Sequence, residues 1–215
     1  MKRIICYISL LCLIAGTSFS LSETLVSVGY ENENAYSNSL YSDFYDAYVY
    51  MNSSGVNINI NQFWKGHNIG LFLQQSFLFP TFYEVKHVNY FDFDLMLFKY
   101  NIIIGPSFRF VLNDNFFLNL GAGFSFSFLV GNTDDKRYFF GLGVNLNANY
   151  DISDIMYIGI GSVFNINTIY DSSGKSISDP RFVFIPAADQ LGFSFKPYLY
   201  IGFHFYNSVG IGKPK

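Results

Sequence analysis

The pattern of hydrophobic and polar positions is clearest between residues 138 and 170, where it repeats every second residue. Large apolar side chains alternate with glycine and asparagine, and a short break falls at 152–154. Because successive side chains of a β-strand point to opposite faces, this period of two predicts two long antiparallel strands joined by a tight turn. The apolar face comprises Phe140, Leu142, Val144, Leu146, Ala148, Tyr150, Ile158, Ile160, Phe164 and Ile166.

The two faces of these strands indicate a membrane environment. The glycine and asparagine positions carry no charged side chain within either strand, whereas about a quarter to a third of a water-exposed surface is normally charged. An uncharged, narrow polar face suits the crowded interior of a small barrel, and the bulky apolar face then contacts lipid. The sequence therefore predicts a transmembrane β-barrel.

Further stretches of the same kind bring the predicted number of strands to eight. Short turns follow the second, fourth and sixth strands, and longer loops follow the first, fifth and seventh, which is typical of bacterial outer-membrane barrels. The polar stretch 31–55 is too long for a tight turn, so we expect it to be the first outer loop, with room for strand extensions at its ends. The additional predicted strands are 24–32, 56–62, 69–79, 90–112, 116–130 and 191–206.

The stretch 90–112 changes phase along its length. Apolar side chains up to Leu97 share one face, whereas those from Tyr100 onward have the opposite parity. A β-bulge produces such a slip of one residue, and we expect one near Phe98. The alternative is two strands with a turn at 99–101, which would make the number of strands odd.

Composition narrows the class of protein further. Of the 215 residues, half are hydrophobic, a fifth are aromatic and only 13% are charged, with 26 Phe and 17 Tyr. Aromatic and β-branched residues favour strands, and the length suits one all-β domain. The net charge of −3 offers no basic surface for nucleic acid.

Residues 1–20 have the three parts of a secretory signal peptide: a positive end at Lys2 and Arg3, an apolar core and a small-x-small cleavage site. We expect cleavage after Ser20, a barrel over 21–206 and a short C-terminal tail over 207–215. An uncleaved anchor is the alternative, but the apolar core has only about a dozen residues, and a spanning helix needs roughly 20.

No catalytic, metal or cofactor site is expected. Both cysteines lie in the predicted signal peptide, so thiolate chemistry is excluded from the remaining chain. Strand parity places His204 in the lumen, while His67 and His87 fall in or beside connections at opposite ends of the barrel. No local motif brings a histidine to a Ser or Asp partner, so we do not expect an enzyme.

Charged residues on the predicted inward face are the first candidate site. Eight strands enclose a space that side chains just fill, so we expect these charges to pair, with Lys196 bonded to Asp92 or Asp94. A binding or gating site is the alternative. The inward charges are Asp92, Asp94, Arg109 and Lys196.

Aromatic residues of the outer loops are the second candidate site. Amphipathic aromatic side chains supply a large contact area at a low entropic cost, so we expect contacts with host or extracellular macromolecules. The alternative is an interfacial belt with a lid over the barrel mouth. The candidate residues are Tyr41, Tyr45 and Tyr48 in the first loop and Arg181, Phe182 and Phe184 in the last.

The whole pattern resembles the small eight-stranded outer-membrane barrels of the OmpX/OmpW type. The segment Gly-Pro-Ser-Phe-Arg-Phe at 105–110 and the low-charge Phe/Asn/Ile composition are also similar to uncharacterised barrel families of spirochaetes. The resemblance implies an all-β, eight-stranded antiparallel up-and-down barrel in the bacterial outer membrane, surrounded by lipid. Such barrels usually end in a terminal aromatic, whereas here 207–215 follow Tyr206. We expect a monomer.

Three functions are compatible with these features. The first is a structural or adhesive surface barrel that acts through its outer loops. The second, implied by the resemblance to OmpW, is a conduit for small apolar molecules. The third is a secreted lipocalin-like carrier with the two faces reversed, and the nearly uncharged surface that this carrier would present to water argues against it.

Overall fold

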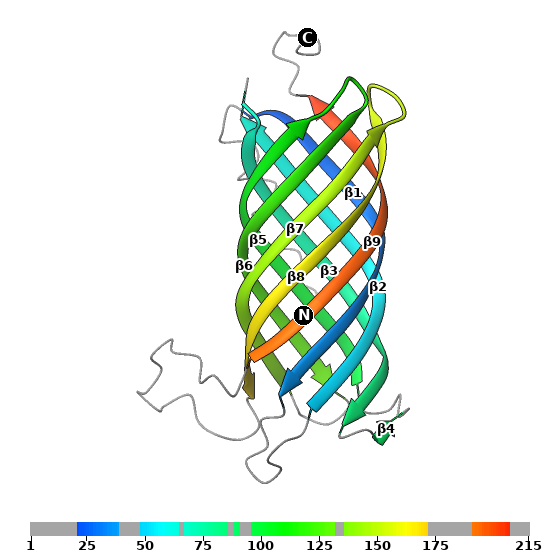
Figure 1. Cartoon of the computed structure of the whole chain (residues 1–215), viewed down its shortest axis with the longest axis vertical. Helices are drawn as coiled ribbons and strands as arrows, with labels where there is room; N and C mark the ends of the chain where they lie inside the picture. The colour runs from blue at the N-terminus through cyan, green and yellow to red at the C-terminus, as the bar shows by residue number, and fades with distance from the viewer. Residues whose placement is uncertain are drawn as a thin grey trace, which may run out of the picture.

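Eight long antiparallel strands close into a barrel in the computed structural model of the chain (Figure 1). The structure describes residues 21–38, 48–64, 67–85, 88–90, 96–131, 136–171 and 191–206. A three-residue strand, β4 (Val88–Tyr90), pairs with the end of the third long strand. The long strands are β1 (Leu21–Asn38), β2 (Tyr48–Trp64), β3 (Ile69–Val85), β5 (Met96–Val111), β6 (Phe116–Gly131), β7 (Lys136–Asp151), β8 (Met156–Asp171) and β9 (Leu191–Tyr206).

Each long strand pairs with the long strands before and after it in the sequence, and β1 also pairs with β9. Val28 of β1 lies opposite Ile201 of β9, so the first and last strands close the sheet into a cylinder. Closure supplies hydrogen-bond partners to backbone groups that would otherwise be unpaired at a sheet edge, which is required of strands in lipid. The predicted eight-stranded up-and-down transmembrane barrel is confirmed. None of the described residues forms a helix long and apolar enough to cross a membrane.

The two ends of the barrel differ in their connections. At the end that we call the short-turn end, β5 and β6 are joined by 112–115, and β7 and β8 by 152–155. The first of these turns is fixed by Asn113, whose Oδ1 accepts hydrogen bonds from the backbone N–H groups of Asn115 and Phe116 at 3.0 and 2.8 Å. The connections 39–47, 132–135 and 172–190 attach at the opposite end, which we call the loop end.

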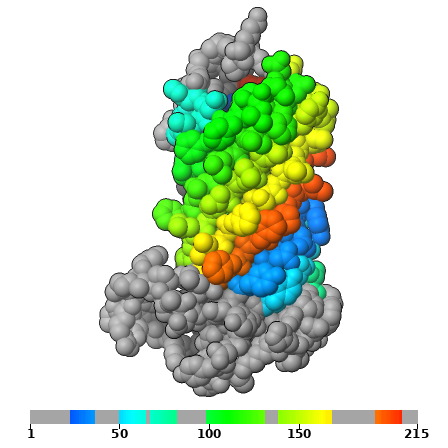
Figure 2. Space-filling model, in the orientation of Figure 1, coloured from blue at the N-terminus to red at the C-terminus, as the bar shows by residue number. Residues whose placement is uncertain are grey.

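The two faces of the sheet have the polarity that the alternation predicts. Outward side chains are large, apolar and exposed, as Phe124 (75%) and Leu142 (60%) illustrate, whereas inward Asn145 and Asn147 are 1–2% exposed. The strands form a continuous outer surface in Figure 2. A barrel that is apolar outside and polar inside is suited to lipid, so the lipocalin-like alternative with reversed faces is wrong.

Glycine on the inward face makes room for aromatic rings that lie against the barrel wall. A Cβ atom built at Gly159 would lie 2.4 Å from the ring of Tyr200, and one built at Gly202 would lie 2.1 Å from the ring of Tyr157. The narrow lumen therefore accommodates tyrosines only because the facing positions lack side chains. This packing explains why glycine recurs on the polar face of the pattern.

The structure confirms the predicted bulge and describes only part of the stretch 90–112 in which it lies. The β5–β6 register shifts between Met96 and Phe98, where the phase of the sequence changes. Residue 90 belongs to β4, β5 is described from Met96, and residues 91–95 lie outside the described ranges.

The first outer loop is much shorter than the stretch 31–55, because the strand extensions expected at its ends take up most of it. Residues 31–38 belong to β1 and 48–55 to β2, which leaves only 39–47 between the two strands. In this hairpin both faces of the sheet are polar, with Glu31 and Glu33 inward and Asn32 and Asn34 outward. No hydrophobic alternation therefore marks these residues as strand.

An arginine on the outward face should destabilise the barrel. Leu146 is 46% exposed and lies along β7, so we expect Leu146→Arg to lower the free energy of unfolding from lipid by about 2–4 kcal/mol, and Phe126→Arg to act similarly. Leu146→Phe, which keeps the position apolar, is the matched control. Denaturant titrations in lipid vesicles measure the difference, and equal stability of the Arg and Phe variants would contradict the assignment of the faces.

Candidate functional site

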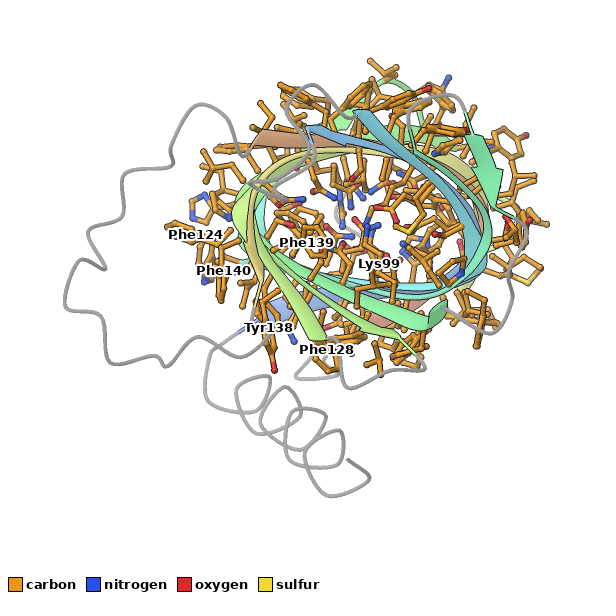
Figure 3. The ribbon with its side chains drawn as sticks, turned by 90° about the horizontal axis from the view of Figure 1, so that it is seen from below. Lys99, Phe124, Phe128, Tyr138, Phe139 and Phe140 are labelled. Atoms are coloured by element: carbon orange, nitrogen blue, oxygen red, sulfur yellow. The ribbon has the colours of Figure 1, made fainter. Side chains whose placement is uncertain are left out.

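Four charged side chains meet inside the barrel towards the loop end, and we call them the lumen charge cluster. β1 supplies Glu31 and Glu33, β5 supplies Lys99, and β9 supplies Lys196, and every one of these side chains is at most 4% exposed. Viewed from the loop end, Lys99 points into the lumen, while Phe124 and Phe140 lie on the outside (Figure 3). Two carboxylates and two ammonium groups make the cluster neutral.

The contacts within this cluster bind three strands together across the lumen. Lys99 Nζ donates a hydrogen bond to Glu33 Oε2 at 2.7 Å. Lys196 Nζ donates to Asn101 Oδ1 at 2.7 Å and lies 3.8 Å from Glu31 Oε1 and 3.6 Å from Glu33 Oε1. Because buried charges are costly unless paired, this geometry favours the closed arrangement of β1, β5 and β9.

Neutral polar groups complete the surroundings of Glu31. Its Oε2 atom accepts hydrogen bonds from Asn57 Nδ2 at 2.5 Å and from Ser76 Oγ at 3.1 Å. Gln74 Nε2 also approaches this atom, at 3.4 Å, and Gln74 Oε1 accepts a hydrogen bond from Asn145 Nδ2 at 2.8 Å. Side chains of β1, β2, β3 and β7 thus meet across the lumen at this level.

A second group of charges lies in the lumen at the short-turn end, and we call it the short-turn-end cluster. His204 lies between two carboxylates, with Nδ1 2.8 Å from Glu23 Oε1 and Nε2 2.8 Å from Asp151 Oδ1. Arg109 Nη1 donates to Glu23 Oε2 at 2.5 Å. The four residues come from β9, β1, β7 and β5, so the cluster connects strands on different sides of the barrel.

Aromatic rings hold the short-turn-end cluster in place. The guanidinium carbon of Arg109 lies 3.9 Å from the ring centroid of Phe63 and 5.3 Å from that of Phe117. The ring of Tyr157 packs against His204 with 5.0 Å between centroids. Among the described residues none accepts a hydrogen bond from Arg109 Nε or Nη2, and the guanidinium group makes cation–π contacts with the two phenylalanine rings. Among the described side chains, no three acidic, histidine or cysteine groups are arranged to hold a metal ion.

The residues predicted as inward charges are only partly within the described chain. Arg109 and Lys196 lie in the lumen, and His204 lies there as well. Asp92 and Asp94 lie outside the described residues, so their predicted pairing with Lys196 stays a prediction. The described partners of Lys196 are instead Asn101, Glu31 and Glu33.

The predicted loop contacts fall at the loop end. Tyr48 is the first residue of β2 rather than a loop residue, and its side chain is not described. The other candidates lie outside the described residues: Tyr41, Tyr45, Arg181, Phe182 and Phe184.

Sequence reasoning missed most of the charged residues that the lumen brings together. Glu31 and Glu33 share the parity of Leu25 and Ser27. Glu31 lies within the predicted strand 24–32, where this parity places it inside, and extending the strand past residue 32 would have placed Glu33 inside as well. Lys99 shares the parity of Arg109, but it directly follows the bulge, where the phase was ambiguous. Glu23 and Asp151 lie close to the ends of their strands, where parity gives little guidance.

Removing one ammonium group from the lumen charge cluster should destabilise the barrel strongly. Lys196→Met leaves a buried carboxylate without its cation, and breaking a buried pair in this way costs about 3–5 kcal/mol. Glu31 has Lys196 as its nearest cation, so adding Glu31→Gln should restore part of the loss. A double-mutant cycle of unfolding free energies in lipid measures the coupling, and purely additive effects would show that the two groups do not interact.

The planar guanidinium group of Arg109 should matter beyond its charge. Arg109→Leu removes both the bond to Glu23 and the contact with Phe63, and we expect a loss of about 1.5–3 kcal/mol. Arg109→Lys keeps the charge but loses the planar stacking, so it should cost less than the leucine variant. Denaturant titrations rank the two, and a leucine variant as stable as the unaltered chain would contradict this role.

Comparison with known proteins agrees with the fold. No family model and no curated protein matches the sequence. Among solved structures, the outer membrane protein AlkL, determined in lipid bilayers, superimposes with a TM-score of 0.55 at 8% identity, covering 91% of this chain and 96% of its own. The neisserial surface protein A superimposes with a TM-score of 0.51 at 14% identity, covering 85% and 96%. The similarity to spirochaete families stays a prediction, and the chain has the fold of the small eight-stranded β-barrels of the bacterial outer membrane.

Proposed function

We propose that this chain is a structural or adhesive protein of the bacterial outer membrane that acts through its loop end rather than through its lumen. The observation that supports this most directly is the filled lumen. Lys196, Glu31 and Glu33 are fully buried within it, and they are held by contacts that cross from strand to strand. A path for solute would require this neutral, paired cluster to come apart.

The loop end carries the features suited to recognition. The β1–β2 hairpin continues as strand up to Asn38 and from Tyr48, and it presents the 57%-exposed ring of Tyr36, which lies 4.8 Å from the ring of Tyr50. Tyr41 and Tyr45 belong to the connection between these two strands. A stiff hairpin that presents tyrosines pre-organises a contact surface, which lowers the entropic cost of binding.

The other parts of the proposal follow from the same fold. Residues 1–20 would direct export and be removed, leaving the barrel at 21–206. Closure through β1 and β9 leaves no long strand with a free edge among the described residues, which suits a monomer surrounded by lipid. The role requires no catalytic chemistry. The conduit for small apolar molecules is less well supported, because it needs space that the lumen side chains occupy.

Substitution of the loop aromatics should abolish adhesion without affecting folding. We expect cells that display Tyr41→Ser with Tyr45→Ser, or Phe182→Ser with Phe184→Ser, to lose most of their attachment to host cells and immobilised matrix proteins. Asp114→Ser, at an exposed position in a short turn at the other end of the barrel, is the matched control and should attach normally. Unchanged attachment of both loop variants would contradict the adhesive role.

Solute passage tests the alternative directly. Liposomes containing the purified barrel should not swell in sugars or take up small apolar molecules faster than empty liposomes. Solute passage through the unaltered barrel that increases further in the variant combining Lys196→Met with Glu31→Gln would favour the conduit.

A further inference from the structure

The outward face of the β1–β2 hairpin is polar, unlike the outward face of its neighbours. Glu31 and Glu33 point inward and are fully buried, so the alternating residues Asn32 and Asn34 point outward. They meet outward polar side chains of β2 and β3. We call this set the outer ladder: Asn32, Asn34, Asn52, Ser54 and Thr81.

Hydrogen bonds hold the outer ladder in one arrangement. Asn32 Nδ2 donates to Ser54 Oγ at 3.0 Å, and Asn52 Nδ2 donates to Asn34 Oδ1 at 3.1 Å. Thr81 Oγ1 donates to Asn52 Oδ1 at 2.8 Å. The ladder has no charged member, and its amide and hydroxyl groups can both donate and accept hydrogen bonds.

Apolar residues flank the outer ladder on both sides. In the strand register Asn34 lies opposite Phe195 of β9, and Ser54 lies opposite Phe79 of β3. Phe195 and Phe79 are 38% and 56% exposed on the outer face. Exposed phenylalanines on both sides indicate lipid at this level, and amide groups facing lipid tails are costly without polar partners. The ladder amides bond to one another, and among the described contacts Asn34 Nδ2 and Ser54 Oγ keep hydrogen-bonding capacity that suits a polar headgroup adjacent to the wall of the barrel.

An apolar groove lies next to the ladder on the short-turn side. Its volume is about 670 Å³, and its rim on β1 is formed by Val28 and Tyr30, two residues before Asn32. The groove runs across β9 and β8 to β7, and Figure 2 shows β1, β9 and β8 side by side on this face. Its other outward lining residues include Leu199, Ile201, Ile158, Ile160 and Ala148.

We propose that the groove and the outer ladder together bind one lipid with an uncharged, hydroxyl-rich headgroup, such as a glycosyl diacylglycerol. An acyl chain occupies the groove and runs towards the membrane centre, while the sugar hydroxyls exchange hydrogen bonds with Asn34 and Ser54, which Asn52 holds in place. The exposed ring of Tyr36 provides an apolar face next to the sugar. A phosphate headgroup would favour Lys or Arg partners, and the ladder contains neither. The site lies on the outer wall of the barrel and is independent of any loop contact.

Lipid competition in nanodiscs tests this proposal. The folded full-length barrel is placed in phosphatidylcholine nanodiscs containing a minor fraction of galactosyl diacylglycerol or, separately, of phosphatidylglycerol. Native mass spectrometry then measures which lipid stays bound. We expect the unaltered chain to retain the galactolipid about tenfold more than either phospholipid, since a few neutral hydrogen bonds suffice for that ratio. Equal retention of all lipids, or preferential retention of phosphatidylglycerol, would overturn the proposal without requiring any variant.

Three variants separate the two parts of the site. Asn34→Leu with Asn52→Leu should remove the galactolipid preference but leave some lipid bound, whereas Ala148→Phe should fill the groove and weaken retention of every lipid. Ser162→Leu, an outward polar change on β8 outside the lining of the groove, is the matched control and should behave like the unaltered chain. Gel migration before and after heating reports whether each variant folds, because heating unfolds the barrel and slows its migration. If the folded ladder variant kept the full galactolipid preference, the ladder would not be the part that selects the headgroup. If the unaltered chain formed dimers that this variant abolishes, the ladder would bind a second copy of the chain instead of the lipid.

Discussion

The pairing of β1 with β9 is the interaction on which the rest of the structure depends. Lipid offers no hydrogen bonds to the backbone, so a sheet can span it only if every strand has two neighbours. The register of this seam places Glu31 opposite Tyr198 and Val28 opposite Ile201. It therefore brings the acidic residues of the first strand to the lumen beside Lys196 of the last, and it aligns the outer surface of both strands for contact with lipid.

Closure with eight strands also determines the chemistry of the interior. The lumen is so narrow that side chains fill it, and charged groups inside must find partners because little water can solvate them. The barrel meets this requirement at two levels, with a neutral set of four charges towards the loop end and a histidine held between two carboxylates at the short-turn end. Tyrosines and asparagines occupy the space between, and glycines at the paired positions of the adjacent strands admit the rings. Such an interior stabilises a rigid cylinder, which is a suitable support for recognition at its rim.

The outer wall is less uniform than the sequence pattern suggests. Apolar side chains cover most of it, but the β1–β2 hairpin turns asparagine and serine outward beside exposed phenylalanines. These amides bond to one another, which lowers the cost of placing them near lipid. The proposed lipid site and the proposed loop contacts thus use different surfaces of the same hairpin, the first its wall and the second the connection at its tip.

The sequence by itself determined the class of fold, the number of long strands and the direction in which most side chains point. Alternation with a period of two, as in Leu142, Val144 and Leu146 against Gly143, Asn145 and Asn147, has only one arrangement that buries the polar set and exposes the apolar set to lipid. The phase change near Phe98 likewise predicted the bulge that the register shows. Where both faces are polar, as in residues 31–38, alternation of hydrophobic character disappears, and the sequence does not indicate how far the strand extends into the predicted loop.

Only the tertiary structure decided which charges meet. Lys196 and Glu31 are far apart in sequence, and their approach depends on the stagger with which β1 and β9 pair and on the curvature of the closed barrel. The short-turn-end cluster draws its residues from four different strands, and no spacing in the sequence indicates that they meet: Glu23, Arg109, Asp151 and His204. The position of the outer ladder beside an apolar groove is likewise decided only by the tertiary structure. Strand parity is a local property that one segment carries, whereas contact across a lumen is a property of register and closure, which belong to the whole sheet.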